Sequence, residues 1–298
     1  MSQRSSLSSK LIFCLLAVYI IWGSTYLGMK IATKVVPPFF LSSLRFLAAG
    51  SLLLIFAYWR ERTWPDRRQL LAACGIGIAL IGIGNTTVAL AVHYMPSGLV
   101  ALMVAAMPAW IMGMDWAFFS KQRPSGLTLV GIAIGFAGLF LLFNPFAQHE
   151  ARTFPLWPVI VVVAGNICWA IGTLLVPRLP MPAQITSTAI QMLAGGIFSF
   201  AISLVLEPGA IHTLSAMPTE GWQAYVYLVL IGSLVGYTSY SWLSKNAPPG
   251  LTATYAYVNP IVALLLGWAI GNEAITPMVG LSAAVVIGGV VMMTLGRR

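Results

Sequence analysis

Ten apolar runs, each about 20 residues long, follow one another along this chain with only short breaks between them. A helix needs about 20 mostly apolar residues to cross the hydrocarbon core of a bilayer. Prolines such as Pro96, Pro124 and Pro277 stand at several breaks, where helices begin or end. The sequence therefore predicts an all-α integral membrane protein. Its ten predicted transmembrane helices cover residues 11–30, 38–58, 70–92, 97–118, 125–143, 156–176, 185–205, 222–243, 250–271 and 276–295.

The composition agrees with a membrane protein. Hydrophobic residues make up 59% of the chain and charged residues only 8%, whereas soluble domains carry roughly 25% charged residues. The net charge of +9 does not indicate a nucleic-acid partner, because no segment gathers basic and aromatic residues on one polar face. Cys14, Cys74 and Cys168 all lie inside apolar runs, and the three histidines are scattered. We therefore expect no disulfide framework, metal site or other cofactor.

Basic residues are distributed unevenly between the breaks, which predicts the orientation. If the N-terminus is cytoplasmic, only Lys30, Lys34 and Arg152 fall on the far side, and Arg45 lies within a span. Lysine and arginine are enriched in cytoplasmic loops, so we predict a multi-pass protein of the bacterial inner membrane with both termini in the cytoplasm. The basic residues on the cytoplasmic side are then Arg4, Lys10, Arg60, Arg62, Arg67, Arg68, Lys121, Arg123, Arg178, Lys245, Arg297 and Arg298.

The two halves of the chain resemble each other. Shifting the sequence by 152 positions places GLVALMVAAMPAW, which starts at Gly98, on GLTATYAYVNPIV, which starts at Gly250, and RFLAAG at 45–50 falls near QMLAGG at 191–196. Because five helices per half is an odd number, the second half must enter the membrane from the opposite side. We predict two inverted five-helix repeats, residues 1–147 and 148–298, an arrangement that recurs in secondary transporters with a binding site between the halves.

At this point the chain also resembles a known family. IIWGSTY at 20–26, RFLAAG at 45–50, GIAIGFAGL at 131–139 and YAYVNPIVALLLG at 255–267 are similar to the EamA-type branch of the drug/metabolite transporter superfamily, over essentially the whole chain. The resemblance extends to bacterial inner-membrane exporters of amino acids and related metabolites, including aromatic amino acid exporters. It implies a transporter but no particular cargo, because members of that branch carry unrelated molecules.

Polar and aromatic side chains inside the predicted spans are the candidates for a cargo site, because hydrocarbon tolerates them poorly unless they face protein or water. Several occupy matching positions in the two halves: Trp22 with Trp169, and Asn85 with Tyr237. Helix packing is the alternative explanation for each of them. We predict that the cargo site is lined by Trp22, Thr25, Asn85, Met103, Met107, Trp169, Tyr237, Tyr255 and Asn259.

Two prolines and two charges inside the spans are further candidates. Pro108 and Pro260 each remove a backbone donor from a span and are predicted hinges, or kinks with no role in transport. Arg45 could be the counter-ion of a substrate carboxylate, or a snorkelling or structurally paired arginine. Asp115 could couple transport to protons, or be an interfacial charge near Lys121 and Arg123.

These patterns together predict a secondary transporter rather than an enzyme. It would export small metabolites, with amino acids as the leading class, by alternating access through a pocket between the repeats. A membrane-embedded enzyme is the alternative, but the seven acidic residues are dispersed instead of clustered at an interface. A non-transporting membrane subunit also stays open. The expected partners are a small-molecule substrate and the lipid bilayer, and the expected state is a monomer or weak homodimer.

Overall fold

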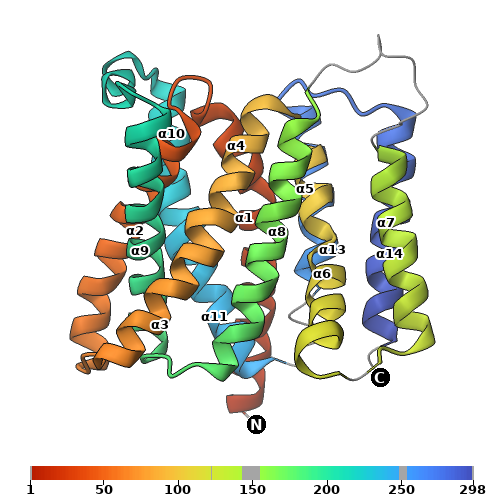
Figure 1. Ribbon diagram of the computed structural model, residues 1–298, viewed down its shortest axis with the longest axis horizontal. Helices are drawn as coiled ribbons and strands as arrows, with labels where there is room; N and C mark the ends of the chain where they lie inside the picture. The colour runs from red at the N-terminus through yellow and green to blue at the C-terminus, as the bar shows by residue number, and fades with distance from the viewer. Residues whose placement is uncertain (1, 122, 143–154, 248–253, 297–298) are drawn as a thin grey trace.

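The computed structural model describes residues 2–121, 123–142, 155–247 and 254–296, and all secondary structure in these ranges is helical (Figure 1). Where a rod changes from α-helix to a π-helix or to a short 3-10 helix, the segments are given separately. The elements are α1 (Ser2–Ala32), α2 (Pro38–Glu61), α3 (Arg67–Gly77), the π-helix η1 (Ile78–Asn85), α4 (Thr86–Tyr94), α5 (Ser97–Ala105), α6 (Met107–Met114), the π-helix η2 (Asp115–Phe119), α7 (Gly126–Leu142), α8 (Trp157–Leu175), the 3-10 helix η4 (Val176–Arg178), α9 (Gln184–Leu206), the 3-10 helix η5 (Ala210–Ala216), α10 (Thr219–Tyr227), the π-helix η6 (Leu228–Val235), α11 (Gly236–Asn246), α13 (Tyr255–Ala269) and α14 (Pro277–Leu295).

The helices agree with the predicted apolar runs. Each predicted range overlaps one helical rod, and the third and eighth rods, residues 67–94 and 219–246, each contain an eight-residue π-helix. By length and composition, six of the described helices can cross a membrane, and three shorter apolar helices follow at Gly126–Leu141, Tyr255–Ala269 and Pro277–Met293. The chain is therefore a multi-pass membrane protein. The full number of ten spans stays a prediction.

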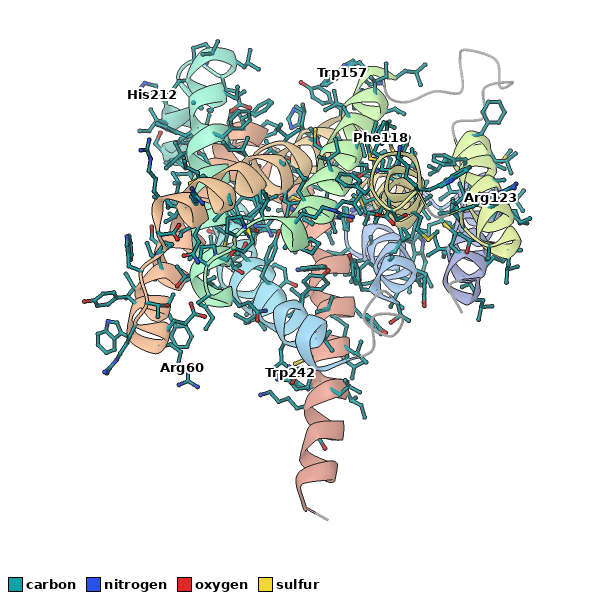
Figure 2. The ribbon with its side chains drawn as sticks, turned by 60° about the horizontal axis from the view of Figure 1, so that its bottom comes forward. Arg60, Phe118, Arg123, Trp157, His212 and Trp242 are labelled. Atoms are coloured by element: carbon teal, nitrogen blue, oxygen red, sulfur yellow. The ribbon has the colours of Figure 1, made fainter. Side chains whose placement is uncertain are left out.

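The outer surface suits a lipid environment. Large apolar side chains cover the outward faces of the helices (Figure 2), and Phe118 and Trp157 are 69% and 42% exposed. So much exposed apolar surface marks contact with membrane or another apolar partner. The rods stand side by side, and α1 begins at the same end of the bundle at which α14 finishes (Figure 1). This fits the prediction that both termini face one side of the membrane.

Helices α2 and α9 pack closely through a pair of reciprocal contacts. A Cβ on Gly50 would lie 2.9 Å from Cγ and 3.0 Å from N of Leu193, while a Cβ on Gly196 would lie 3.0 Å from the same two atoms of Leu47. Glycine permits this approach because it has no side chain. The four residues belong to the RFLAAG and QMLAGG segments, so the sequence match corresponds to a structural contact. The contact stays the same when the two halves are exchanged, as expected for halves related by a two-fold axis.

A second reciprocal pair fixes the ends of the same two helices. The Glu61 carboxylate at the end of α2 accepts hydrogen bonds from the backbone N of Ile185 and Thr186, both at 2.9 Å, at the start of α9. The Glu207 carboxylate after α9 accepts from N of Phe39 (3.0 Å) and Phe40 (2.8 Å) at the start of α2. Each carboxylate thus satisfies amides that an isolated helix start leaves without partners. The two helices are tied at both ends.

We expect Glu207→Gln to destabilise the protein. The amide side chain loses the charge and one acceptor, so a backbone N–H of α2 is left without its partner, at roughly 1.5–3 kcal/mol for a charged hydrogen bond. The measurement is thermal unfolding of the detergent-solubilised protein, with a lower midpoint expected. Glu220→Gln is the control, because Glu220 is exposed in the first turn of α10. Equal midpoints for the two variants would show that the Glu207 contact contributes nothing.

The bundle is packed most extensively toward the end at which α2 and α5 begin. The largest buried cluster lies there and includes Met29, Phe40, Val92 and Leu102. Polar contacts close the same end. Lys30 Nζ donates to the Met95 carbonyl at 3.0 Å, and the Glu273 carboxylate accepts from the backbone N of Ser97 (2.7 Å) and Gly98 (3.2 Å) at the start of α5.

Charged contacts also lie at the opposite end, where the Glu61 cap of α9 is found. In the described ranges the ion pair of this end joins Arg178 Nη2 to Asp115 Oδ1 at 3.5 Å, with side chains 41% and 36% exposed. An exposed pair at this distance contributes little stability.

Candidate functional site

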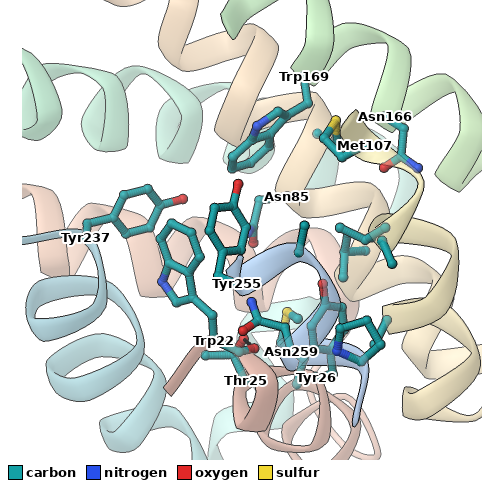
Figure 3. A pocket seen from close by; sticks show the side chains of 18 of the residues that line it. Trp22, Thr25, Tyr26, Asn85, Met107, Asn166, Trp169, Tyr237, Tyr255 and Asn259 are labelled. Atoms are coloured by element: carbon teal, nitrogen blue, oxygen red, sulfur yellow. Dashed lines mark hydrogen bonds between the residues drawn. The ribbon is translucent and has the colours of Figure 1, made fainter. Parts of the chain in front are cut away.

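A pocket of about 90 Å³ lies inside the helix bundle (Figure 3). A water molecule needs roughly 10–15 Å³ by the same measure, so the space suits several waters or a small solute. One wall is continuous with the largest buried cluster, to which Tyr26, Met29 and Val88 belong. The lining residues come from both halves of the chain: Trp22, Thr25, Tyr26, Met29, Arg45, Gly84, Asn85, Val88, Ala101, Val104, Ala105 and Met107 from the first, and Asn166, Trp169, Tyr237, Tyr255, Ala256, Asn259 and Pro260 from the second.

The pocket contains most of the residues that the sequence suggested for a cargo site. All of them except Met103 lie on its wall, together with Pro260 and Arg45. Met103 is 2% exposed and belongs to the buried core. Pro108 and Asp115 also do not line the pocket. Binding of a cargo by these residues stays a prediction, but their spatial proximity is now a structural fact.

Two tryptophans face the pocket from equivalent positions. A Cβ on Gly236 of α11 would lie 2.6 Å from Nε1 of Trp22, and a Cβ on Gly84 of η1 would lie 2.9 Å from Cε3 of Trp169. Each indole therefore rests against a glycine next to or within a π-helix, and exchanging the halves again leaves the contact unchanged. π-helical turns are frequent at functional sites. The sequence predicted the pairing of the tryptophans but not the π-helices.

Trp22 is also the centre of an aromatic cluster that joins three helices. Its ring centroid lies 5.4 Å from that of Tyr237, 5.0 Å from Tyr240 and 5.3 Å from Tyr255. The Tyr237 and Tyr255 contacts are edge-to-face, which is a favourable arrangement at these distances, and the Tyr240 ring is tilted. The cluster fixes the Trp22 ring at the pocket wall (Figure 3).

We expect Gly236→Ala to impair transport. Its new methyl group would overlap the Trp22 indole and push the ring toward the pocket, because backbone atoms of α11 cannot withdraw as easily as a side chain. The expected result is at least a severalfold loss of transport with a normal amount of protein in the membrane. Gly113→Ala is the control, since no atom lies within 4 Å of a Cβ at that position. Full activity of Gly236→Ala would argue against a fixed position for Trp22.

The segment WGSTY in α1 combines packing with pocket lining. A Cβ on Gly23 would lie 2.6 Å from Cβ of Val262, so this glycine lets α1 approach α13. Ser24 Oγ hydrogen-bonds the Tyr227 hydroxyl. Thr25 lines the pocket, but its hydroxyl donates to the Trp22 carbonyl at 2.7 Å. Within this one motif, Gly23 serves helix packing and Thr25 lines the pocket, so each of the two alternatives that the sequence left open applies to a different residue.

Two asparagines satisfy carbonyl groups next to the helix breaks. Asn166 is 3% exposed, and its Nδ2 donates to the Met103 carbonyl at 3.0 Å. The Asn259 amide, oriented according to its neighbours, donates to the carbonyls of Tyr255 and Tyr19 at 3.2 Å each. Met103 and Tyr255 are equivalent in the two halves, and each of their carbonyls accepts from an asparagine of the second half. These contacts explain the polar residues at positions where hydrocarbon would penalise them.

The two predicted hinges differ in structure. The fourth rod is interrupted at Ala106, and Pro108 is the second residue of the new helix α6. Pro260 instead lies inside the continuous helix α13. A proline in the first turn of a helix removes a donor that would have no partner anyway, whereas an internal one leaves a carbonyl without its usual partner. The sequence could not distinguish these two cases.

The two charged candidates, Arg45 and Asp115, lie in different places. Arg45 is 3% exposed and lines the pocket, so it does not snorkel to an interface. Asp115 is paired with Arg178 at the bundle end, as an interfacial charge would be. The described residues contain no group of three or more His, Cys, Asp or Glu side chains arranged to hold a metal ion.

Several lining residues were not predicted from the sequence. Tyr26, 8% exposed, follows directly on the predicted Thr25. Ala101 and Ala105 stand four residues apart on one face of α5, where small side chains leave room for the cavity. Small residues are common in all membrane helices, so their spacing alone does not identify a pocket.

Comparison with known proteins identifies the class of protein that this fold and pocket define. The model of the EamA-like transporter family matches residues 9–144 and again residues 156–295. The chain therefore belongs to the EamA-like transporter family, as the sequence motifs predicted, and carries two copies of its repeat.

Individual relatives agree. The "Uncharacterized inner membrane transporter YedA" of Escherichia coli K12 is 39% identical over 285 residues, covering 95% of this chain and 90% of that protein. The "Probable amino-acid metabolite efflux pump" of the same organism is 25% identical over 292 residues, covering 95% and 94%. A solved crystal structure with 20% sequence identity superposes with a TM-score of 0.66 over 96% of this chain and 97% of that one, which shows a shared fold.

Proposed function

We propose that this chain is a secondary transporter of the inner membrane that exports small amphipathic metabolites, with amino acids as the leading class, by alternating access. The observation that carries the proposal is a single pocket lined by equivalent residues of both halves. Trp22 corresponds to Trp169, and Asn85 to Tyr237, across the two copies of the family repeat. A site between two related halves suits alternating access, because each half can then close one side of it.

The reciprocal contacts support an inverted relation of the repeats. The Gly50 and Gly196 contacts, the Glu61 and Glu207 caps, and the tryptophan and glycine pairs all exchange when the halves are exchanged. We propose the inverted five-helix arrangement, with both termini cytoplasmic, on this basis and on the distribution of basic residues.

The chemistry of the pocket and the names of two relatives support the cargo and the membrane. Aromatic rings and Met107 offer apolar contact, while asparagine, tyrosine and arginine offer hydrogen bonds, as sites for small amphipathic molecules do. One relative is named a probable amino-acid metabolite efflux pump, and another an inner membrane transporter. Both names are consistent with amino acid export across the inner membrane.

Counterflow in proteoliposomes tests the proposal. Purified protein would be reconstituted into vesicles loaded with one unlabelled amino acid at a time, and uptake of the labelled compound measured with no ion gradient imposed. We expect saturable exchange for a subset of neutral amino acids. The same vesicles loaded with nucleosides measure selectivity. No exchange of any amino acid, with or without a proton gradient, would contradict the proposed cargo class.

A further inference from the structure

The Arg45 guanidinium is a buried charge on the wall of the pocket. Its Nε donates to Ser233 Oγ at 2.9 Å, and its Cζ lies 4.8 Å from the centroid of the Phe46 ring. A guanidinium carries five N–H donors and is charged at every physiological pH. The Ser233 bond uses one donor, so the Nη groups still have hydrogen-bonding capacity. Burying such a charge is unfavourable unless a counter-ion accompanies it.

The protein does not supply that counter-ion among its described residues. Glu61, Glu207 and Glu273 each accept backbone hydrogen bonds at helix starts. Asp115 pairs with Arg178, and Asp66 caps α3 by accepting from Gln69 N at 2.8 Å. The remaining described acidic residue, Glu220, is exposed on α10. The ion pair found among the described residues joins Arg178 to Asp115 and does not involve Arg45.

A second polar group of the same pocket also has no partner. Oδ1 of Asn85 is buried and, among the described residues, receives no hydrogen bond. A buried acceptor without a donor is unfavourable. The pocket therefore presents a set of donors at Arg45 and an acceptor at Asn85, both on one cavity. The residue that corresponds to Arg45 in the second half is Gln191, whose Nε2 donates to Ser187 Oγ. The charge at this position therefore occurs in one half only.

We propose that the cargo is a carboxylic acid with an ammonium group, held by its carboxylate on the Nη groups of Arg45 and by an N–H on Oδ1 of Asn85. This inference rests on the proposed transport function and deepens it. The apolar part of the cargo would contact Trp22 and Trp169. Guanidinium matches the planar carboxylate with two parallel hydrogen bonds, and the carboxylate is the counter-charge that Arg45 lacks among the described residues.

Ligand-induced thermal stabilisation of the purified full chain tests the inference. The probes are neutral L-amino acids from alanine to tryptophan, and for each the primary amide, the decarboxylated amine and the deaminated acid. A ligand that binds the folded state raises the unfolding midpoint. We expect at least one amino acid to raise the midpoint. The affinity of its amide and its amine should be at least tenfold lower, and that of its deaminated acid lower by a smaller factor. Failure of every amino acid, or equal effects of acid and amine, would overturn the proposal.

Variants separate binding by Arg45 from a structural role. Arg45→Gln introduces the residue found at the corresponding position of the second half, and should remove the preference for acid over amine. Arg45→Lys keeps the charge without the planar fork and should retain part of that preference. The ratio between probes is read within one preparation, so a lower yield of folded protein does not change it. Arg60→Gln, exposed near the end of the same helix, is the control and should leave the ratio unchanged.

Counterflow distinguishes this inference from the transport proposal. If wild-type protein exchanges amines or uncharged solutes but no carboxylic acid, the transporter stands and the Arg45 inference fails. If acids bind with the expected dependence on Arg45 and no exchange is seen, the binding site stands and the transport function fails. An unchanged acid preference in Arg45→Gln overturns the inference in either case.

Discussion

Trp169→Ala is expected to lower transport at subsaturating cargo about 30-fold while leaving the protein in the membrane. The half-buried indole lines the pocket opposite the Trp22 cluster. Removing an aromatic contact surface from a bound cargo removes about 2 kcal/mol of binding energy, which corresponds to roughly a 30-fold loss of affinity. The measurement is the initial rate of counterflow in proteoliposomes, normalised to reconstituted protein.

Trp268→Ala is the matched control for this substitution. Trp268 lies on α13 but is 60% exposed on the outside of the bundle, so its removal should leave the rate nearly unchanged. Similar losses in both variants would indicate a general effect of removing tryptophan. Unchanged rates in Trp169→Ala would contradict the assignment of this pocket to the cargo.

Gly289→Leu is expected to prevent correct assembly of α7 with α14. A Cβ at this position would lie 2.5 Å from N of Gly135 and 2.7 Å from O of Gly131, both backbone atoms that cannot rotate away. A leucine would therefore force the helices apart over their whole contact. We expect a several-fold lower yield of monodisperse protein after detergent extraction, measured by size-exclusion chromatography.

Its neighbour provides the control. Gly288→Leu adds the same side chain one residue earlier, where no atom lies within 4 Å of a Cβ. The two variants share helix propensity and hydrophobicity, so a difference between them reports the helix contact alone. Equal yields would show that the approach of α7 and α14 at Gly289 is not needed for the fold.

The arrangement of helices could largely be predicted from the sequence, because hydropathy and length determine which segments can cross a bilayer. Two details could not. The π-helices η1 and η6 have no hydropathy signature that differs from an α-helix, although η1 ends at Asn85 and η6 ends two residues before Tyr237, both at the pocket. The break at Ala106 was expected only as a kink at Pro108, because a proline predicts a disturbance but not its exact place.

The site could be predicted in part, and the reason lies in the repeat. Residues at matching positions in two related halves meet near the axis between them, which brought Trp22 and Trp169 to one cavity. Met103 was expected there because Tyr255 is its equivalent, but its side chain is buried in the core. The caps by Glu61 and Glu207 were not foreseen, since nothing in the local sequence shows which distant helix start a carboxylate reaches.

Access to the pocket from the two sides of the membrane tests the account most directly. In a protein with Cys14, Cys74 and Cys168 replaced by serine, Ala105→Cys would place a thiol on the pocket wall, at a position that is 3% exposed. A membrane-impermeant thiol reagent is then added to right-side-out or inside-out vesicles that still carry out exchange. The account predicts labelling from both sides. Labelling from one side only, in a variant that still exchanges cargo, would contradict alternating access through this pocket.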